Sequence, residues 1–154
     1  MKKISYLPGI LILIIVSGCS KNNDYFSYHK FNDQTWSRFN VLQFEIPVNT
    51  TEKIYDISLI VSHSKEYEFD YLDFNMIMTT PSGEERIREY HLDIKRKDGK
   101  FTGKCNDDSC EVSVVLKREL NLTKGILTLE IENLVPRMEI KGLLGIGIRL
   151  HPVR

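Results

Sequence analysis

The sequence predicts an all-β fold, namely an antiparallel β-sandwich of two sheets with Greek-key or jelly-roll-like connections. From residue 25 onward, apolar and polar residues alternate with a period of two, which is typical of strands that bury one face. No window of about 12 residues keeps apolar side chains three and four positions apart, as an amphipathic helix requires. Residues that favour turns separate the alternating segments at regular intervals, and this pattern is typical of a sandwich.

Seven segments show the alternation, and we expect each to form a strand: residues 42–48, 55–62, 72–79, 90–95, 112–117, 127–132 and 144–151. In chain order, the side chains expected on the core face begin with Leu42, Phe44, Ile46 and Val48, then Tyr55, Ile57, Leu59 and Val61, then Leu72, Phe74, Met76 and Met78, and continue with Tyr90, Leu92, Ile94, Val112, Val114, Leu116, Leu127, Leu129, Ile131, Leu144, Ile146, Ile148 and Leu150. A single sheet would leave these apolar faces uncovered, so we expect two sheets to face each other.

The connections between these segments carry turn residues. Pro81-Ser82-Gly83 separates two strands, and Asp98-Gly99 is a pair that favours tight hairpins because glycine tolerates positive φ. Pro136 ends a strand because proline has no N–H to donate to the next one. These turns agree with antiparallel neighbours rather than with long helical crossovers.

The N-terminal segment has the three parts of a secretory signal. Lys2 and Lys3 precede an aliphatic run at residues 10–16, which is much shorter than the roughly 20 residues that span a bilayer as a helix. Residues 16–19, Val-Ser-Gly-Cys, resemble the bacterial lipobox, in which the cysteine is diacylated and the signal is cut just before it. We therefore expect residues 1–18 to be a cleaved lipoprotein signal peptide and Cys19 to carry the lipid that holds the protein on a membrane. An ordinary signal peptide with a chance cysteine is the alternative.

The rest of the chain has the length of one domain. Removal of residues 1–18 leaves 136 residues, which is enough for a single core. We expect residues 19–30 to form the lipidated N-terminus and a tether, and residues 31–154 to form the sandwich domain. The formal net charge is 0 for the full chain and −2 after loss of Lys2 and Lys3, and no basic stripe is present. The charge therefore gives no indication of a nucleic-acid partner, and we expect none.

Two cysteines remain after Cys19, and they flank an acidic loop in Cys105-Asn-Asp-Asp-Ser-Cys110. Outside the cytoplasm such a pair favours a disulfide, with free thiols as the alternative. A metal site fits less well, because no histidine lies at zinc-ligand spacing and the loop lacks the alternating carboxylates of a calcium hand. We expect a Cys105–Cys110 disulfide and no bound metal or other cofactor.

No group of residues in the sequence predicts catalysis. The four histidines stand alone, and His63 continues the inward register of residues 55–61, so we interpret it as a half-buried structural residue. Nucleophile-elbow, zincin and Walker patterns are absent. The glycines at 142, 145 and 147 have the wrong order for a dinucleotide fingerprint, and we expect them to admit another backbone or a bulky side chain. The sequence therefore predicts a protein that is not an enzyme.

Aromatic residues are the remaining candidates for binding. Trp36 and Phe39 are expected to plug one end of the core, whereas Tyr67, Phe69 and Tyr71 surround an acidic loop. Aromatic rings on a loop can stack on sugars or anchor a partner protein. We take Tyr67, Phe69 and Tyr71 as a candidate binding edge, since loops carry function more often than strands.

Several segments, in this order and spacing, together resemble the gliding-motility lipoprotein GldH family of the Bacteroidota. They are residues 31–36, 42–46, 55–63, 79–83 and 99–103, Met138 and residues 143–150. The resemblance implies a lipid-anchored envelope protein associated with gliding and with type 9 secretion, and it assigns no catalytic residue. It favours a non-enzymatic scaffold or adaptor that binds envelope proteins of that machinery.

By the same resemblance, lipoproteins of the Bacteroidota that are exported to the cell surface usually carry a dense acidic run just after the lipidated cysteine. Residues 20–24 contain a single Asp. We therefore expect the protein to lie on the outer membrane with its domain facing the periplasm. The alternative function is that of a glycan- or peptidoglycan-binding module.

Overall fold

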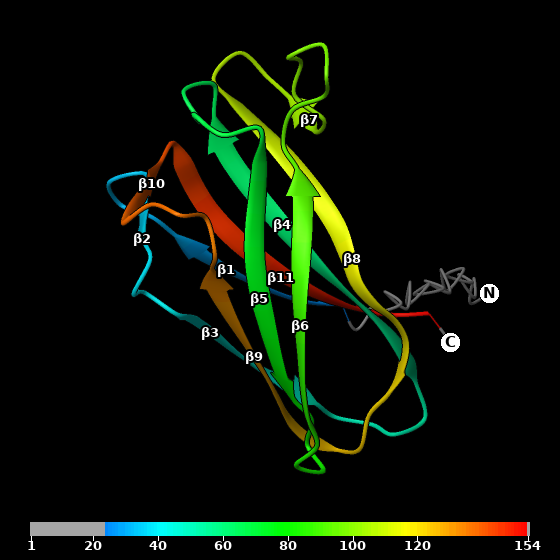
Figure 1. The fold of residues 1–154 in the computed structure, drawn as a ribbon. Helices are drawn as coiled ribbons and strands as arrows, with labels where there is room; N and C mark the ends of the chain where they lie inside the picture. The colour runs from blue at the N-terminus through cyan, green and yellow to red at the C-terminus, as the bar shows by residue number, and fades with distance from the viewer. Residues whose placement is uncertain (1–23, 154) are drawn as a thin grey trace, which may run out of the picture.

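The computed structural model describes residues 24–153, and every regular element in that range is a strand (Figure 1). The described residues contain no helix with the length and hydropathy needed to cross a membrane. The strands are β1 (Tyr25–Lys30), β2 (Thr35–Ser37), β3 (Leu42–Val48), β4 (Ile54–Ser64), β5 (Tyr71–Thr79), β6 (Glu85–Asp93), β7 (Lys104–Cys105), β8 (Ser109–Asn121), β9 (Gly125–Asn133), β10 (Glu139–Lys141) and β11 (Leu143–Pro152).

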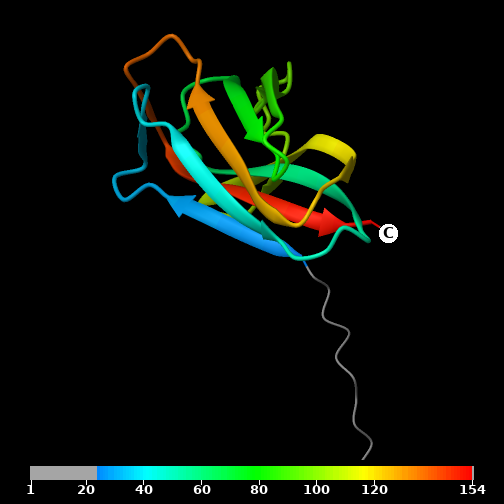
Figure 2. The ribbon, with the colours of Figure 1, turned by 90° about the horizontal axis from the view of Figure 1, so that it is seen from below.

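The strands form two main sheets that pack face to face, and both are antiparallel (Figure 2). Sheet A has the order β1-β11-β4-β8-β7, sheet C has the order β3-β9-β5-β6, and β2 pairs only with β10. If the eight longer strands are numbered along the chain, sheet A reads 1-8-3-6 and sheet C reads 2-7-4-5. This order is that of a jelly roll, in which two Greek keys wrap the chain around one core. The predicted all-β sandwich is confirmed.

The core lies between the sheets and is built from the inward half of each alternating strand. Each of the seven expected segments lies in a strand, although β6 ends at Asp93, and their inward residues include the fully buried Ile57, Phe74 and Leu129. Leu144 is not the buried leucine at the start of β11: the register shifts between Leu143 and Gly145, and Leu143 is fully buried in its place. Trp36 closes one end of this core, where its indole Nε1–H donates to the Asn40 carbonyl at 2.7 Å. Phe39 does not join it: the expectation of a second plug is wrong, because the Phe39 side chain is 76% exposed.

The strand β1 lies inside the segment that we expected to be a tether. Tyr25–Lys30 pairs along its whole length with β11, from Tyr25 opposite Leu150 to Lys30 opposite Gly145. The sandwich therefore begins at residue 25 rather than at residue 31. Periodicity did not identify β1 because it is an edge strand with a largely exposed burial pattern, and only Tyr25 packs against the core.

The glycines of β11 admit bulky side chains, as expected from the sequence. A Cβ on Gly145 would clash with the ring of Tyr28, and one on Gly147 would lie 2.9 Å from Cε2 of Phe26. The two aromatic side chains of β1 thus lie directly on the glycine backbone of the neighbouring strand.

The two ends of the sandwich differ in their distance from Tyr25, the first residue of β1. We call the end where β1 and β4 begin the proximal end, and the end where β1 and β4 finish, at Lys30 and Ser64, the distal end. The distal end carries the β7–β8 hairpin and the loop between β4 and β5. Loops at the distal end therefore lie furthest along the fold from residue 25.

Candidate functional site

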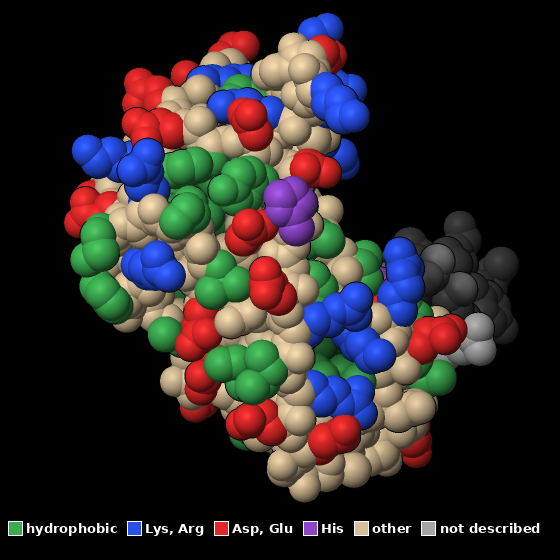
Figure 3. All heavy atoms as spheres, in the orientation of Figure 1, with side chains coloured by type: hydrophobic (Ala, Val, Ile, Leu, Met, Phe, Trp, Pro, Cys, Tyr) green, Lys and Arg blue, Asp and Glu red, His purple; other side chains and the backbone are tan. Residues whose placement is uncertain are grey.

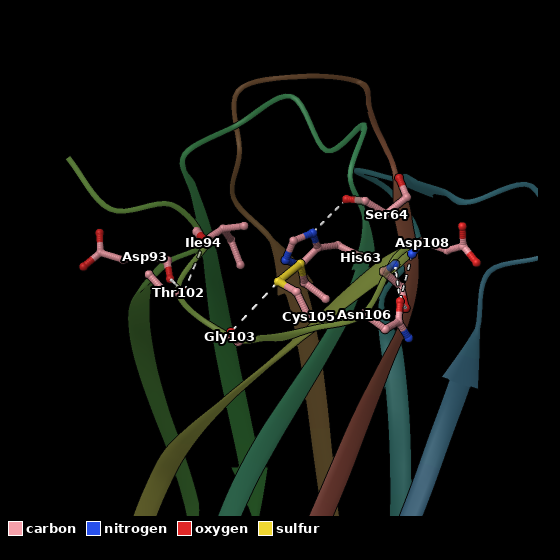
Figure 4. The surroundings of a disulfide bond; sticks show 11 residues. His63, Ser64, Asp93, Ile94, Thr102, Gly103, Cys105, Asn106 and Asp108 are labelled. Atoms are coloured by element: carbon pink, nitrogen blue, oxygen red, sulfur yellow. Dashed lines mark hydrogen bonds between the residues drawn. A yellow bond between two sulfur atoms is a disulfide. The ribbon is translucent and has the colours of Figure 1, made fainter. Parts of the chain in front are cut away.

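The β7–β8 hairpin carries the disulfide expected from the cysteine pair (Figure 4). Cys105 and Cys110 are direct cross-strand partners, and the bridge closes the hairpin at the point where the two strands meet. The loop between them is held by the Asn106 side chain, whose Oδ1 accepts hydrogen bonds from the backbone N–H groups of Asp108 and Ser109. Asp107 and Asp108 are exposed. The hairpin is thus a rigid, acidic projection at the distal end.

His63 lies beneath this hairpin, opposite Cys110 in the β4–β8 register. Its side chain is fully buried between the rings of Tyr67 and Phe101, at centroid distances of 5.5 and 4.9 Å. Nδ1 lies 2.9 Å from the Ser64 carbonyl, whereas Nε2 has no partner among the described residues. Burial lowers the pKa of His63 below its ordinary value, which keeps the ring neutral. The residue is packed more deeply than the half-buried position that we expected.

The predicted binding edge of Tyr67, Phe69 and Tyr71 is largely internal. Tyr67 is 2% exposed, and its hydroxyl donates to the Tyr71 carbonyl at 2.9 Å. Burial raises the pKa of the Tyr67 phenol, in keeping with a neutral side chain inside the fold. Phe69 and Tyr71 are partly buried against the core. The interpretation of Tyr67 as an exposed binding residue is therefore wrong in this structure, because the ring fills the distal end of the sandwich.

A metal centre in residues 24–153 would require a group of side chains that could bind a metal ion. Within that range, no group of three or more histidine, cysteine, aspartate or glutamate side chains is arranged to hold a metal ion. Cys19, the expected lipidation site, and the signal peptide at residues 1–18 lie outside the described residues.

The outer face of sheet C is acidic. Alternation along β3, β5, β6 and β9, together with their register, fixes which side chains point outward. Seven of these outward side chains are carboxylates, and none of those in the four described strands is Lys or Arg, since Arg86 and Arg88 of β6 are in register with the inward Met78 and Met76. The seven carboxylates are Glu45, Asp73, Glu85, Glu89, Asp93, Glu130 and Glu132. The alternation is visible in the sequence, but only the strand order shows that the outward carboxylates of these four strands share one surface.

Apolar side chains lie among these carboxylates. Ile77 of β5 is opposite Ile87 of β6, whose side chain is 63% exposed, and Ile126 of β9 is 51% exposed. In Figure 3, acidic and hydrophobic side chains share the surface over β5, β6 and β9, and Lys and Arg side chains gather toward the seam with β8. We call this surface the acidic face. It combines apolar contact area with charge of a single sign.

His91 is the one basic side chain on the acidic face. Its Nδ1–H donates to Oδ1 of Asp73 at 2.5 Å, its Nε2 lies 3.3 Å from Asp93, and its ring stacks on Tyr71 at 5.2 Å. The hydrogen bond to Asp73 raises the pKa of His91 above its ordinary value. Protonation of His91 therefore reduces the negative charge of this face as the pH falls.

Comparison with known proteins agrees with the resemblance seen in the sequence. The family model described as GldH lipoprotein matches residues 23–150. The gliding motility lipoprotein GldH of Flavobacterium johnsoniae is 25% identical over 152 residues, and the alignment covers 93% of this chain and 94% of that protein. Among solved structures, the coat protein of Tobacco streak virus aligns over 87% of this chain and 90% of its own, at 15% identity and a TM-score of 0.28, which is too low to support an argument. Because the family model spans most of the sequence, from before β1 to residue 150 in β11, the chain belongs to the GldH lipoprotein family.

Proposed function

We propose that this protein is a non-enzymatic, lipid-anchored adaptor of the cell envelope, and that its acidic face binds a basic surface on an envelope protein of a gliding or type 9 secretion machinery. Membership of a lipoprotein family supports the anchor and the envelope location. One observation carries the adaptor role: seven carboxylates and no Lys or Arg point outward from the four strands of sheet C.

This charge pattern favours association with a basic partner. Charge of one sign across a surface accelerates encounter with the opposite sign and disfavours partners of the same sign. The Ile77–Ile87 pair offers an apolar centre of the kind that contributes most of the binding energy in many interfaces. The carboxylates around this pair would form the polar rim of the interface and determine the orientation of the bound partner.

The anchor would hold the domain close to the membrane. Cys19 and Tyr25 are separated by six peptide units, which span at most about 20 Å when fully extended. Two or three acyl chains on Cys19 would give durable attachment, since each buried methylene contributes about 0.8 kcal/mol. We place the protein on the outer membrane with its domain facing the periplasm, so that its distal end and acidic face meet other envelope proteins there.

Charge reversal on the acidic face tests this function. We would compare a Glu89→Lys/Glu130→Lys variant with a matched control, Glu52→Lys/Glu139→Lys, which reverses the same number of carboxylates at exposed positions outside the acidic face. After cross-linking of the tagged, lipidated protein in its own envelope, we expect the first variant to lose a specific protein partner and the control to retain it. Equal recovery of that partner with both variants would contradict the adaptor role of this face.

A Cys19→Ala variant tests the anchor separately. We expect it to leave the membrane fraction while the folded domain persists. Persistence of this variant in the membrane fraction at wild-type level would contradict anchoring through Cys19.

The glycan-binding alternative is not supported at Tyr67, because that ring lies inside the fold. Two exposed aromatic residues, Phe26 and Tyr28 of β1, lie on the outer face of sheet A, on the opposite side of the sandwich from the acidic face.

A further inference from the structure

The outer face of sheet A differs from the acidic face in both shape and chemistry. Its strand register aligns outward side chains in three rows across β1, β11, β4 and β8. The rows are Phe26-Arg149-Ser58-Val115, Tyr28-Gly147-Ile60-Ser113 and Lys30-Gly145-Ser62-Glu111, with Lys104 of β7 opposite Glu111. Aromatic side chains thus occupy one border, and small side chains occupy most of the middle.

The aromatic border is a platform of two exposed rings, which we call the Phe26–Tyr28 platform. The side chains are 52% and 40% exposed, their centroids lie 6.2 Å apart, and their planes differ by 28°. Because Gly145 and Gly147 have no Cβ, the rings rest on the backbone of β11. The rings therefore lie against the sheet and leave about half of their surface exposed, and they do not project from the sheet as an inserting side chain would.

A hollow of about 410 Å³ lies beside the platform on this face. Ile60, Ser113, Arg149 and Glu111 line it from β4, β8 and β11. Thr102 lines it from the segment before β7, and Lys104 lines it from β7 itself. Its volume is within the range of small-molecule sites. Arg149 links the two features, since its guanidinium lies 5.6 Å from the centroid of the Phe26 ring.

Cations outnumber carboxylates around the hollow. Arg149 and Lys104 line it with a single carboxylate, Glu111, and Lys30 lies in the adjoining row. Among the described residues, neither Arg149 nor Lys104 forms an ion pair. The face thus presents available positive charge next to exposed aromatic ring faces.

We propose that this face of sheet A binds an acidic polysaccharide, with sugar rings stacked on Phe26 and Tyr28 and sugar carboxylates paired with Arg149 and Lys104. Ring faces stack on the apolar C–H faces of sugars, whereas charge complementarity selects glycans that carry carboxylates. The small side chains in the middle allow a chain to approach the sheet closely. The site lies on the opposite side of the sandwich from the acidic face, so loss of either function leaves the other testable.

The test uses the full mature protein in detergent and measures its retardation in gels that contain polygalacturonate or neutral dextran. We expect retardation by polygalacturonate only, and at least tenfold weaker binding in Tyr28→Ala and in Arg149→Gln. The matched controls are Phe39→Ala, an exposed aromatic elsewhere, and Arg88→Gln, an arginine that lies 5.3 Å from the ring centroid of Tyr90. We expect both controls to bind as the wild type does.

Gly147→Ala provides a second probe because it retains every proposed ligand-binding group. The three atoms nearest to the new Cβ all belong to the side chains of Phe26 and Tyr28, so we expect the rings to be displaced, polygalacturonate binding to fall and the fold to persist. Three results would overturn the proposal: equal retardation by dextran, equal loss in the control variants, or no retardation at all. Binding of the same residues to anionic vesicles in place of polygalacturonate would instead make this face a membrane contact, and would also overturn it.

Discussion

Tyr67 gives the sharpest prediction, because the sequence suggested a binding residue and the structure makes it part of the core. Its ring is 2% exposed, packs beside His63 and Phe69, and has its hydroxyl bonded to the Tyr71 carbonyl. Tyr67→Phe removes only that hydrogen bond and leaves a carbonyl without its donor, so we expect the free energy of unfolding to fall by about 1–2 kcal/mol. Tyr67→Ala also removes the ring and leaves a cavity, so we expect a loss of about 3–5 kcal/mol.

Equilibrium denaturation in urea measures both losses on the same protein. The control is Phe39→Ala, which removes a ring that is 76% exposed and is expected to change stability by less than about 0.5 kcal/mol. If Tyr67→Ala unfolded within that same margin of the wild type, Tyr67 would not be a core residue. The prediction from the sequence that Tyr67 belongs to an exposed binding edge would then hold after all.

Three further predictions concern the disulfide, the histidines and one glycine. Cys105→Ala/Cys110→Ala opens a six-residue loop, and we expect a loss of about 2 kcal/mol in urea denaturation; an unchanged midpoint would contradict a bridge that stabilises the fold. NMR titration should place the pKa of His91 above 6.5 and that of His63 below it, and Asp73→Asn should lower only the first. Because folding raises the pKa of His91, its contribution to stability is full below pH 6.5 and is lost as the pH rises through its folded pKa. Because folding lowers the pKa of His63, the unfolded state binds a proton more readily at this residue, and stability therefore falls as the pH falls below 6.5. Gly142→Ala should destabilise by more than about 1 kcal/mol, since φ is +82° and the new Cβ would lie 2.8 Å from the backbone nitrogen of Tyr67; a wild-type melting temperature would refute that reasoning.

The main architecture could be predicted because alternation carries the necessary information. In strands such as β3 and β5, every second residue is buried, so the pattern in the sequence is the pattern of the fold. The short strands β2, β7 and β10 could not be predicted from alternation. β2 and β10 have three residues each and β7 has two, which is too few for a period to be recognised.

Edge strands were the second source of error. β6 begins at Glu85, five residues before the predicted start, because its first residues lie at the open edge of sheet C and need no apolar face. β1 was assigned to the tether for the same reason.

The two surfaces could not be derived from the sequence, because each depends on which strands are neighbours. Glu89 and Glu130 are far apart in the chain and come together only through the order β9-β5-β6. Similarly, the contact of Tyr28 with Gly145 and Gly147 follows from the pairing of the first strand with the last. The sequence could show only that the glycines made room for something large.

Photo-cross-linking from Ile87 tests the central claim, that the acidic face binds an envelope protein, most directly. A photoreactive amino acid would replace Ile87 on the acidic face or Val115 on the outer face of sheet A, in the lipidated protein in its own envelope. We predict a discrete adduct with one envelope protein from position 87, none with that protein from position 115, and loss of the adduct with Glu89→Lys/Glu130→Lys. An absent protein adduct at position 87, or the same adduct from both positions, would contradict the adaptor function.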